Sequence, residues 1–254
     1  FLMNKEIRTS GILKIRMPLL AVVTVSLPFF AFLTCIYLSV VNNFSLATAT
    51  HCGVPNYLPS ISSAIGEFVP QRYIWRFAIA VHSAPRFMMV GLYSSFMKSV
   101  LPPHPVYEKL RKVNAILNLV ENFALLGLSF VSSRENYDLH KVFFITFMLC
   151  SELYMILTYL LMKDNTQFLA KPLERLAFRK KKQLMSFNIF CFFFALYFFY
   201  RHNAYCETGM YTFFAFFEYM VVLSNMGFHM TAYYDFYDHE LVIGERTSSL
   251  SSPS

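Results

Sequence analysis

The stretch LMSFNIFCFFFALYFFY, residues Leu184–Tyr200, contains no charged side chain. An apolar run of about 17–25 residues is long enough to cross a hydrocarbon core about 30 Å thick as an α-helix. The composition of the chain points the same way, since 56% of its 254 residues are hydrophobic, 15% are charged and the mean hydropathy is +0.44. A soluble domain of this size rarely has this balance, so the sequence predicts a membrane protein.

Apolar runs of similar length recur along the chain and cover residues 17–41, 73–97, 113–131, 142–162, 184–200 and 208–232. We expect an all-α, polytopic membrane protein, a six-transmembrane-helix bundle that spans residues 17–232. The first run is longer than the apolar core of a signal peptide, about 7–15 residues, and is interpreted as a retained helix. The remaining segments are an N-terminus (1–16), loops at 42–72 and 163–183, and a tail (233–254).

The distribution of Lys and Arg predicts the orientation of these helices. With alternating spans, 16 of the 22 lie on one side and 4 on the other, while Arg76 and Arg86 lie inside the second run. Because positive charge concentrates in the cytosol, both termini and loop 163–183 are expected there, and loop 42–72 in the lumen. The basic run Arg179–Lys182 is interpreted as an anchor beside anionic lipid. The net charge of +7 therefore does not indicate nucleic acid.

Cysteine positions predict one disulfide. Three of the five cysteines lie inside predicted spans, where a small buried thiol is the ordinary interpretation: Cys35, Cys150 and Cys191. Cys52 and Cys206 lie in predicted lumenal loops, the oxidising side of the membrane. We expect these two to pair and to clip loop 42–72 over the bundle, with two free thiols as the alternative. No Cys-x-x-Cys, His-x-x-x-His or Gly-rich phosphate loop is present, so we expect no metal and no bound cofactor.

Polar residues recur at helical spacing inside three of the predicted spans. Residues at i, i+4 and i+7 share one face of a helix, and the third span places there Asn114, Asn118 and Glu121, with Asn122 beside them. A second stripe, in the sixth span, consists of Glu218, Asn225 and His229. The second span carries Arg72, Arg76, His82 and Arg86 over about a third of its circumference.

Ionisable groups inside hydrocarbon cost several kcal/mol unless they are paired or hydrated. We therefore expect the second, third and sixth spans to pack around a polar interior. There Arg86 or Arg76 would pair with one of the acidic residues Glu121, Glu218 and Glu152. The alternative is purely structural, with a buried ion pair, asparagines as interhelical contacts and satisfied histidines. A functional cavity is favoured because a buried ion pair is often no more stable than apolar packing.

The simplest chemistry for this set is acyl transfer to a lipid hydroxyl. His82 is the expected general base, oriented by Glu121 or Glu218, and His229, nearer the cytosolic end, is the alternative base. Donors to an oxyanion would be Arg86, Asn118 and Asn225, with Asn122 beside them. Residues nearer the lumen suit an anionic, sugar-bearing headgroup, although loop solvation also explains them: His51, Asn56, Arg72, Arg76, His202, Asn203 and Glu207.

Four longer segments carry a family resemblance. They read THCGVPNYLPSISSAIGEFVPQRYIWRF (50–77), HSAPRF (82–87), NLVEN (118–122) and YFFYRHNAYCETGMYTFFAFFEYMVVLSNMGFHMTAYYDF (197–236). They closely resemble the family of post-GPI-attachment-to-proteins factor 2. The wider group includes the damage-regulated autophagy modulators and the N-terminal domains of fungal GPI-lipid remodelling proteins. The resemblance covers about residues 15–243.

The resemblance implies a multi-pass protein of the Golgi or ER membrane that acts in GPI-anchor maturation. Its expected reaction is reacylation of lyso-GPI at sn-2 with a saturated chain, with acyl-CoA or a phospholipid as the acyl donor. Expected partners are membrane lipids, GPI-anchored proteins and other remodelling enzymes. The alternatives are a non-catalytic adaptor that binds lyso-GPI for a separate acyltransferase, and a lipid transporter or scramblase.

Overall fold

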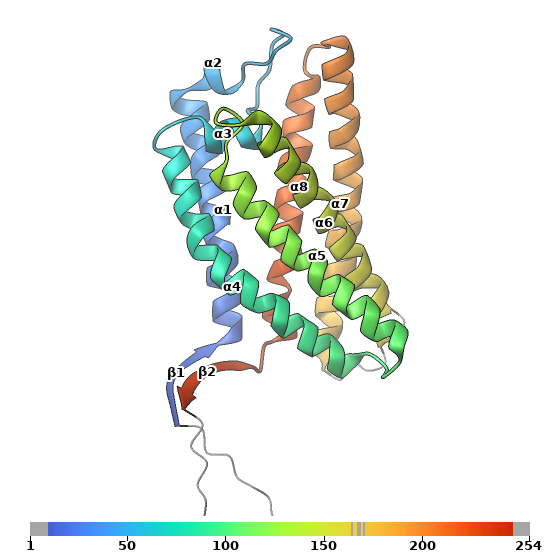
Figure 1. The fold of residues 1–254 in the computed structure, drawn as a ribbon. Coiled ribbons are helices and arrows are strands. Elements are labelled where there is room, and N and C mark those ends of the chain that lie inside the picture. Colours follow the sequence, from blue (N-terminus) through green and yellow to red (C-terminus); the bar gives the residue numbers. More distant parts are fainter. Residues whose placement is uncertain (1–9, 164, 167–168, 170, 246–254) are drawn as a thin grey trace, which may run out of the picture.

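The computed structural model describes residues 10–163, 165–166, 169 and 171–245. Within them, long helices pack side by side in a bundle (Figure 1): α1 (Met17–Asn42), α4 (Gln71–Val100), α5 (Pro105–Phe130), α6 (Tyr137–Lys163), α7 (Pro172–Tyr205) and α8 (Met210–Met230). Four of these, α1, α5, α6 and α7, are long and apolar enough to cross a membrane. Helices α4 and α8 are not among these four, because their polar stripes lower their mean hydropathy. The predicted class of a helical membrane protein is confirmed.

The two ends of the bundle differ (Figure 1). At one end, residues 43–70 fold over the helices and include the short helices α2 (Phe44–Ala47) and α3 (Ile61–Gly66). A disulfide joins Cys52 in this segment to Cys206 between α7 and α8, and we call this the disulfide end. At the other end, the strand end, β1 (Ser10–Arg16) pairs antiparallel with β2 (Glu240–Glu245), which follows the short helix α9 (Ala232–Asp235).

The strand pair corrects the all-α prediction. Neither strand was predicted, because each is short on its own and the two lie far apart in the chain. The pairing joins Arg16 to Glu240, and the amide of Met17 donates to the carbonyl of His239 at 3.0 Å. Residues 1–9 and 246–254 of the predicted termini lie outside the described residues.

The prediction of a basic loop at residues 163–183 was wrong for the second half of that range. Helix α7 already begins at Pro172, and Arg179–Lys182 continue it as helix. Proline suits the first turn of a helix because its missing N–H would have no partner there. Lys181 is buried and pairs with Asp235, so it does not face lipid headgroups. The fifth span, predicted at 184–200, is therefore part of a much longer helix.

Candidate functional site

The polar stripes meet in the interior of the bundle. Arg86 on α4 and Glu121 on α5 form an ion pair, with 3.1 Å between Nη2 and Oε1, and their side chains are 6% and 0% exposed. The guanidinium Nε of Arg86 also donates to Asn122 Oδ1 at 2.9 Å. Two opposite charges out of water stabilise each other, whereas either one alone would be costly. The predicted pairing of Arg86 with Glu121 is therefore what the structure shows.

Two residues of α8 complete this arrangement. Oε1 of Glu121 also accepts from Asn225 Nδ2 at 3.2 Å, and it lies 3.0 Å from His229 Nε2. Asn225 Nδ2 donates as well to Ser151 Oγ of α6 at 2.6 Å, so four helices converge here. We call Arg86, Glu121, Asn122, Asn225 and His229 the deep polar cluster. Asn118 lies at its edge, where its Oδ1 accepts from Asn122 at 3.4 Å.

His82 is also buried, but no carboxylate orients it. Its Nδ1 lies 2.7 Å from the backbone carbonyl oxygen of Thr24 on α1. A carbonyl only accepts, so Nδ1 carries the proton and Nε2 keeps a free lone pair. The prediction that Glu121 or Glu218 orients His82 was wrong, because Glu121 bonds His229 and Glu218 accepts from the amide of Ile61 at 3.0 Å. His82 nevertheless keeps the lone pair that a general base requires.

A cavity connects these groups. The space between its lining side chains is about 820 Å³ when the solvent at its open mouth is counted. Most of its wall is apolar, with contributions from α1, α3, α4, α5, α6 and α8. The ionisable and polar side chains that border it are Ser62, His82, Arg86, Ser129, Glu218, Asn225 and His229. The wall is therefore mainly suited to CH₂ groups, with polar side chains at a few points.

Two predicted interior partners lie elsewhere. Arg76 pairs with Glu135 at 2.6 Å and donates to the carbonyl of Phe130 at 2.8 Å, near the disulfide end, and not with an interior carboxylate. The amide of Ser132, and then the Arg76 guanidinium, lower the pKa of Glu135 to about 2. Glu152 is buried on α6 and pairs with no cation among the described residues, so its predicted pairing with an arginine was wrong.

Three of the seven predicted headgroup-binding residues contact loop 42–72 or lie beneath it. Asn56 is buried and fixes the chain by bonding Thr48, Leu58 and Thr212. Arg72 donates to the backbone carbonyl of Gly66 at 2.8 Å. His202 is fully buried beneath the loop and not on the surface as expected. The remaining members lie partly or fully exposed near the disulfide: His51, Asn203, and Glu207 in an ion pair with Arg201.

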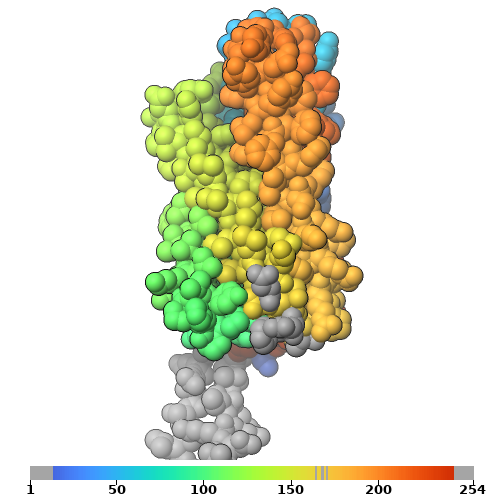
Figure 2. Space-filling view, turned by 90° about the vertical axis from the view of Figure 1, so that its right-hand side faces the viewer, coloured from blue at the N-terminus to red at the C-terminus, as the bar shows by residue number. Residues whose placement is uncertain are grey.

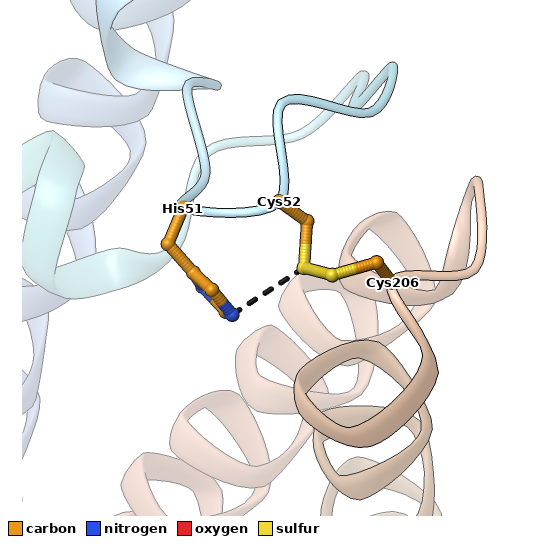
Figure 3. Close-up of side chains that lie close together, drawn as sticks. All are labelled: His51, Cys52 and Cys206. Atoms are coloured by element: carbon orange, nitrogen blue, oxygen red, sulfur yellow. Dashed lines mark hydrogen bonds between the residues drawn. A yellow bond between two sulfur atoms is a disulfide. The ribbon is translucent and has the colours of Figure 1, made fainter.

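His51, Cys52 and Cys206 lie together at the disulfide end (Figure 3). Nε2 of His51 is 3.3 Å from Cys52 Sγ. Three such side chains resemble a metal-ligand set, but a metal requires free thiolates. Here the two sulfur atoms are bonded to each other. Their role is to hold residues 43–70 against the α7–α8 connection.

Sequence reasoning missed three polar residues that contact the site. Ser151 bonds Asn225, and its only signal was its place beside Glu152 in a predicted span. Ser62 borders the cavity, and its Oγ lies 3.0 Å from Nε2 of His140. Each of these two was assigned to a loop, and no spacing connects them.

The family pattern described as Frag1/DRAM/Sfk1/Cwh43P N-terminal domain matches residues 16–239. The chain is 48% identical to Acyltransferase PGAP2 of Xenopus tropicalis over 92% of this chain and 93% of that protein. It is 43% identical to Post-GPI attachment to proteins factor 2 of Drosophila melanogaster, over 86% and 85% of the two chains. Protein cwh43 of Schizosaccharomyces pombe is 24% identical over 78% of this chain and 19% of that protein. No solved structure matches.

The match to the family pattern extends from the first residue of the bundle region to the start of β2, and so includes every helix that borders the cavity. The alignments with the relatives at 40–48% identity also cover most of the length of those proteins. The chain therefore belongs to the Frag1/DRAM/Sfk1/Cwh43p family, in the group of post-GPI attachment to proteins factor 2.

Proposed function

We propose that this chain acts in GPI-anchor maturation as a membrane-embedded O-acyltransferase that reacylates lyso-GPI at sn-2 with a saturated fatty acid. The names of the relatives, Acyltransferase PGAP2 and Post-GPI attachment to proteins factor 2, support the pathway. The observation that carries the proposal is the cavity, because its apolar wall suits an acyl chain while its polar groups suit ester chemistry. Buried ionisable groups beside an apolar wall are not required for the stability of a helix bundle, because apolar packing often stabilises it equally well.

The same proposal includes six spans, with both termini in the cytosol and the disulfide end in the lumen of the Golgi or ER. The excess of Lys and Arg in the strand-end segments supports this orientation. The disulfide supports it independently, because such bonds persist on the oxidising side of the membrane. Lyso-GPI on GPI-anchored proteins would then reach the cavity from the lumenal leaflet.

Acyl transfer needs a proton acceptor beside the attacking hydroxyl and donors beside the carbonyl oxygen. The cavity offers His82, whose Nε2 keeps a lone pair, and Arg86, whose guanidinium has N–H groups beyond those bonded to Glu121 and Asn122. The acyl donor is acyl-CoA or a phospholipid, used as a co-substrate without a bound cofactor. A cavity enclosed by helices also keeps water from the acyl ester, which would otherwise be hydrolysed.

The test is transfer by the purified protein in liposomes that contain lyso-GPI and a labelled saturated acyl donor, followed by mass spectrometry of the GPI. Wild type is expected to move label into GPI. Val222→Trp, which fills the cavity, should abolish transfer. The matched control is Val81→Trp, because Val81 points outward and is 47% exposed.

The outcomes separate the alternatives. Absence of transfer by folded wild type that still binds lyso-GPI contradicts the enzyme and favours an adaptor. Movement of lyso-GPI between leaflets without new ester favours a transporter. Equal transfer by Val222→Trp and Val81→Trp would show that the reaction does not use this cavity.

A further inference from the structure

A hydroxyl and an imidazole meet at the disulfide end of the cavity. Oγ of Ser62 on α3 lies 3.0 Å from Nε2 of His140, in the first turn of α6. Helix α3 belongs to the segment that folds over the bundle, so the contact joins that segment to α6. Ser62 borders the cavity, and His140 is 7% exposed.

The direction of this hydrogen bond follows from a third group. Nδ1 of His140 lies 2.7 Å from the backbone carbonyl oxygen of Val131. Because the carbonyl only accepts, Nδ1 carries the ring proton of the neutral imidazole. Nε2 then holds the lone pair and accepts the hydroxyl proton of Ser62. A nucleophile, a base and a group that orients the base are thus in line, which is the arrangement of an activated serine.

The surroundings suit an acyl ester. Ile65, one turn after Ser62 on α3, and Phe144, one turn after His140 on α6, both border the cavity, as does Leu128. An acyl chain that lies along these side chains would bring its carbonyl carbon to the mouth. Among the described residues, no hydroxyl is hydrogen-bonded to His229 of the deep polar cluster, because Ser151 Oγ accepts from Asn225 and His229 Nε2 bonds Glu121.

We propose that Ser62 is the acyl-accepting nucleophile of this protein and that His140 is its base, so that acyl transfer passes through an ester on Ser62 Oγ. The inference rests on the proposed function and refines it. His140 carries the proton, while His82 and the deep polar cluster shape the inner part of the cavity. The substrate class is an acyl ester or thioester.

Each half-reaction balances. Ser62 Oγ attacks the acyl carbonyl carbon, its proton passes to His140 Nε2, and the bond from that carbon to the donor's leaving oxygen or sulfur breaks. The leaving group takes the proton from His140 and departs as a lysophospholipid or as CoA. The sn-2 hydroxyl of lyso-GPI then attacks the Ser62 ester, gives its proton to His140, and the proton returns to Ser62 Oγ as the ester bond breaks.

The first experiment isolates the first half-reaction. Purified wild type in nanodiscs is incubated without lyso-GPI, in one arm with labelled palmitoyl-CoA and in another with a labelled phosphatidylcholine, and then quenched in acid. Peptide mass spectrometry should find a hydroxylamine-sensitive acyl group on Ser62 with one of the two donors. The arm that labels Ser62 identifies the donor. A long-chain alkyl fluorophosphonate, which reacts with activated serines, should label the same residue.

Matched variants separate chemistry from folding. Ser62→Ala should lose the acyl group, the fluorophosphonate label and transfer to lyso-GPI. His140→Gln should lower the labelling rate by about 10²–10⁴-fold. Ser63→Ala is the control, because Ser63 Oγ bonds the carbonyl of Ala47 at 3.0 Å and so fixes the same segment without contacting an imidazole. It should acylate and transfer like wild type.

The failures are distinguishable. Full transfer by Ser62→Ala, with no acyl group on wild-type Ser62, overturns this inference and leaves the proposed function standing. Absence of both transfer and Ser62 labelling in folded wild type overturns both. Equal losses of transfer in Ser63→Ala and Ser62→Ala would contradict the role of Ser62 as nucleophile, because they would show that residues 43–70 act only through their position.

Discussion

Two helix pairs in this bundle differ in the proportion of aromatic and charged contacts that join them. Helices α7 and α8 pack through phenylalanine rings, with Phe198 stacked on Phe213 and Phe217 at centroid distances of 5.1 and 5.6 Å. Helices α4 and α5 meet through Arg86, Glu121 and Asn122. The outer face of α7 is also aromatic and lies on the surface along most of its length (Figure 2).

The difference shows where this protein can tolerate change. Ring stacking is additive and its geometry is broad, so one lost contact leaves the others in place. A buried ion pair is different, because the loss of one partner leaves the other charge without compensation. The α4–α5 interface also contributes Arg86 to the cavity wall, so the interface that is harder to keep lies beside the proposed site.

The largest effect is expected from breaking the buried pair on one side only. Glu121→Leu should lower the free energy of unfolding by about 3–5 kcal/mol, because Arg86 remains buried without its partner. The double variant Arg86→Leu/Glu121→Leu should recover much of that stability but not acyl transfer. Thermal unfolding in nanodiscs and the liposome assay measure the two quantities. A double variant as unstable as the single one would show that the pair is needed for folding itself.

A smaller loss of stability is expected from removing the disulfide, which joins residues 43–70 to the connection between α7 and α8. Cys52→Ser should lower the free energy of unfolding by about 2–4 kcal/mol, because the reduced chain has more freedom when unfolded. The same shift should appear when wild type is measured with a thiol reductant, and the reductant should not affect Cys52→Ser further. A reductant effect on Cys52→Ser would assign part of the shift to other groups.

The aromatic interface should respond more weakly. Phe198→Ala removes both ring contacts of this side chain with α8, which at about 0.5–1.5 kcal/mol each contribute a loss of about 1–3 kcal/mol. Acyl transfer by the folded variant should remain near the wild-type rate, since Phe198 does not border the cavity. Loss of transfer at unchanged stability would contradict the division between the two interfaces.

The smallest effect is expected at the exposed pair between α4 and the α5–α6 connection. Glu135→Gln should change stability by less than about 1 kcal/mol, because exposed ion pairs gain little in water. Since the pKa of Glu135 is lowered to about 2, any contribution is fully present above about pH 4.3 and disappears as the pH falls toward 2. Unfolding of wild type and variant should therefore differ by the same small amount at pH 5 and pH 7.

Helical spacing predicted the faces of the site but not its pairs. Asn118, Glu121 and Asn225 are all buried, as their stripes required, because a fixed rotation per residue determines which side chains share a face. Which carboxylate meets which histidine depends on the tilt and rotation of whole helices. That is why His229 and not His82 bonds Glu121.

Contacts between distant segments without a periodic pattern were beyond prediction. Ser62 lies in a helix of six residues inside a loop, and His140 in the first turn of α6, so neither shows a periodic signal. The start of α7 was not predicted for another reason. Four consecutive basic residues, Arg179–Lys182, are typical of a solvated loop, and the sequence does not show that Asp235 lies beside Lys181.

The strand pair at the end of the bundle has a consequence for synthesis. β1 precedes the first helix to leave the ribosome, whereas its partner β2 emerges only after α9. During translation β1 is therefore an unpaired edge, and the amide of Met17 lacks the carbonyl of His239. A nascent chain stopped before residue 240 would display that open edge beside a bundle whose helices have all been made. Completion of the ladder therefore requires that every helix of the bundle has already been made.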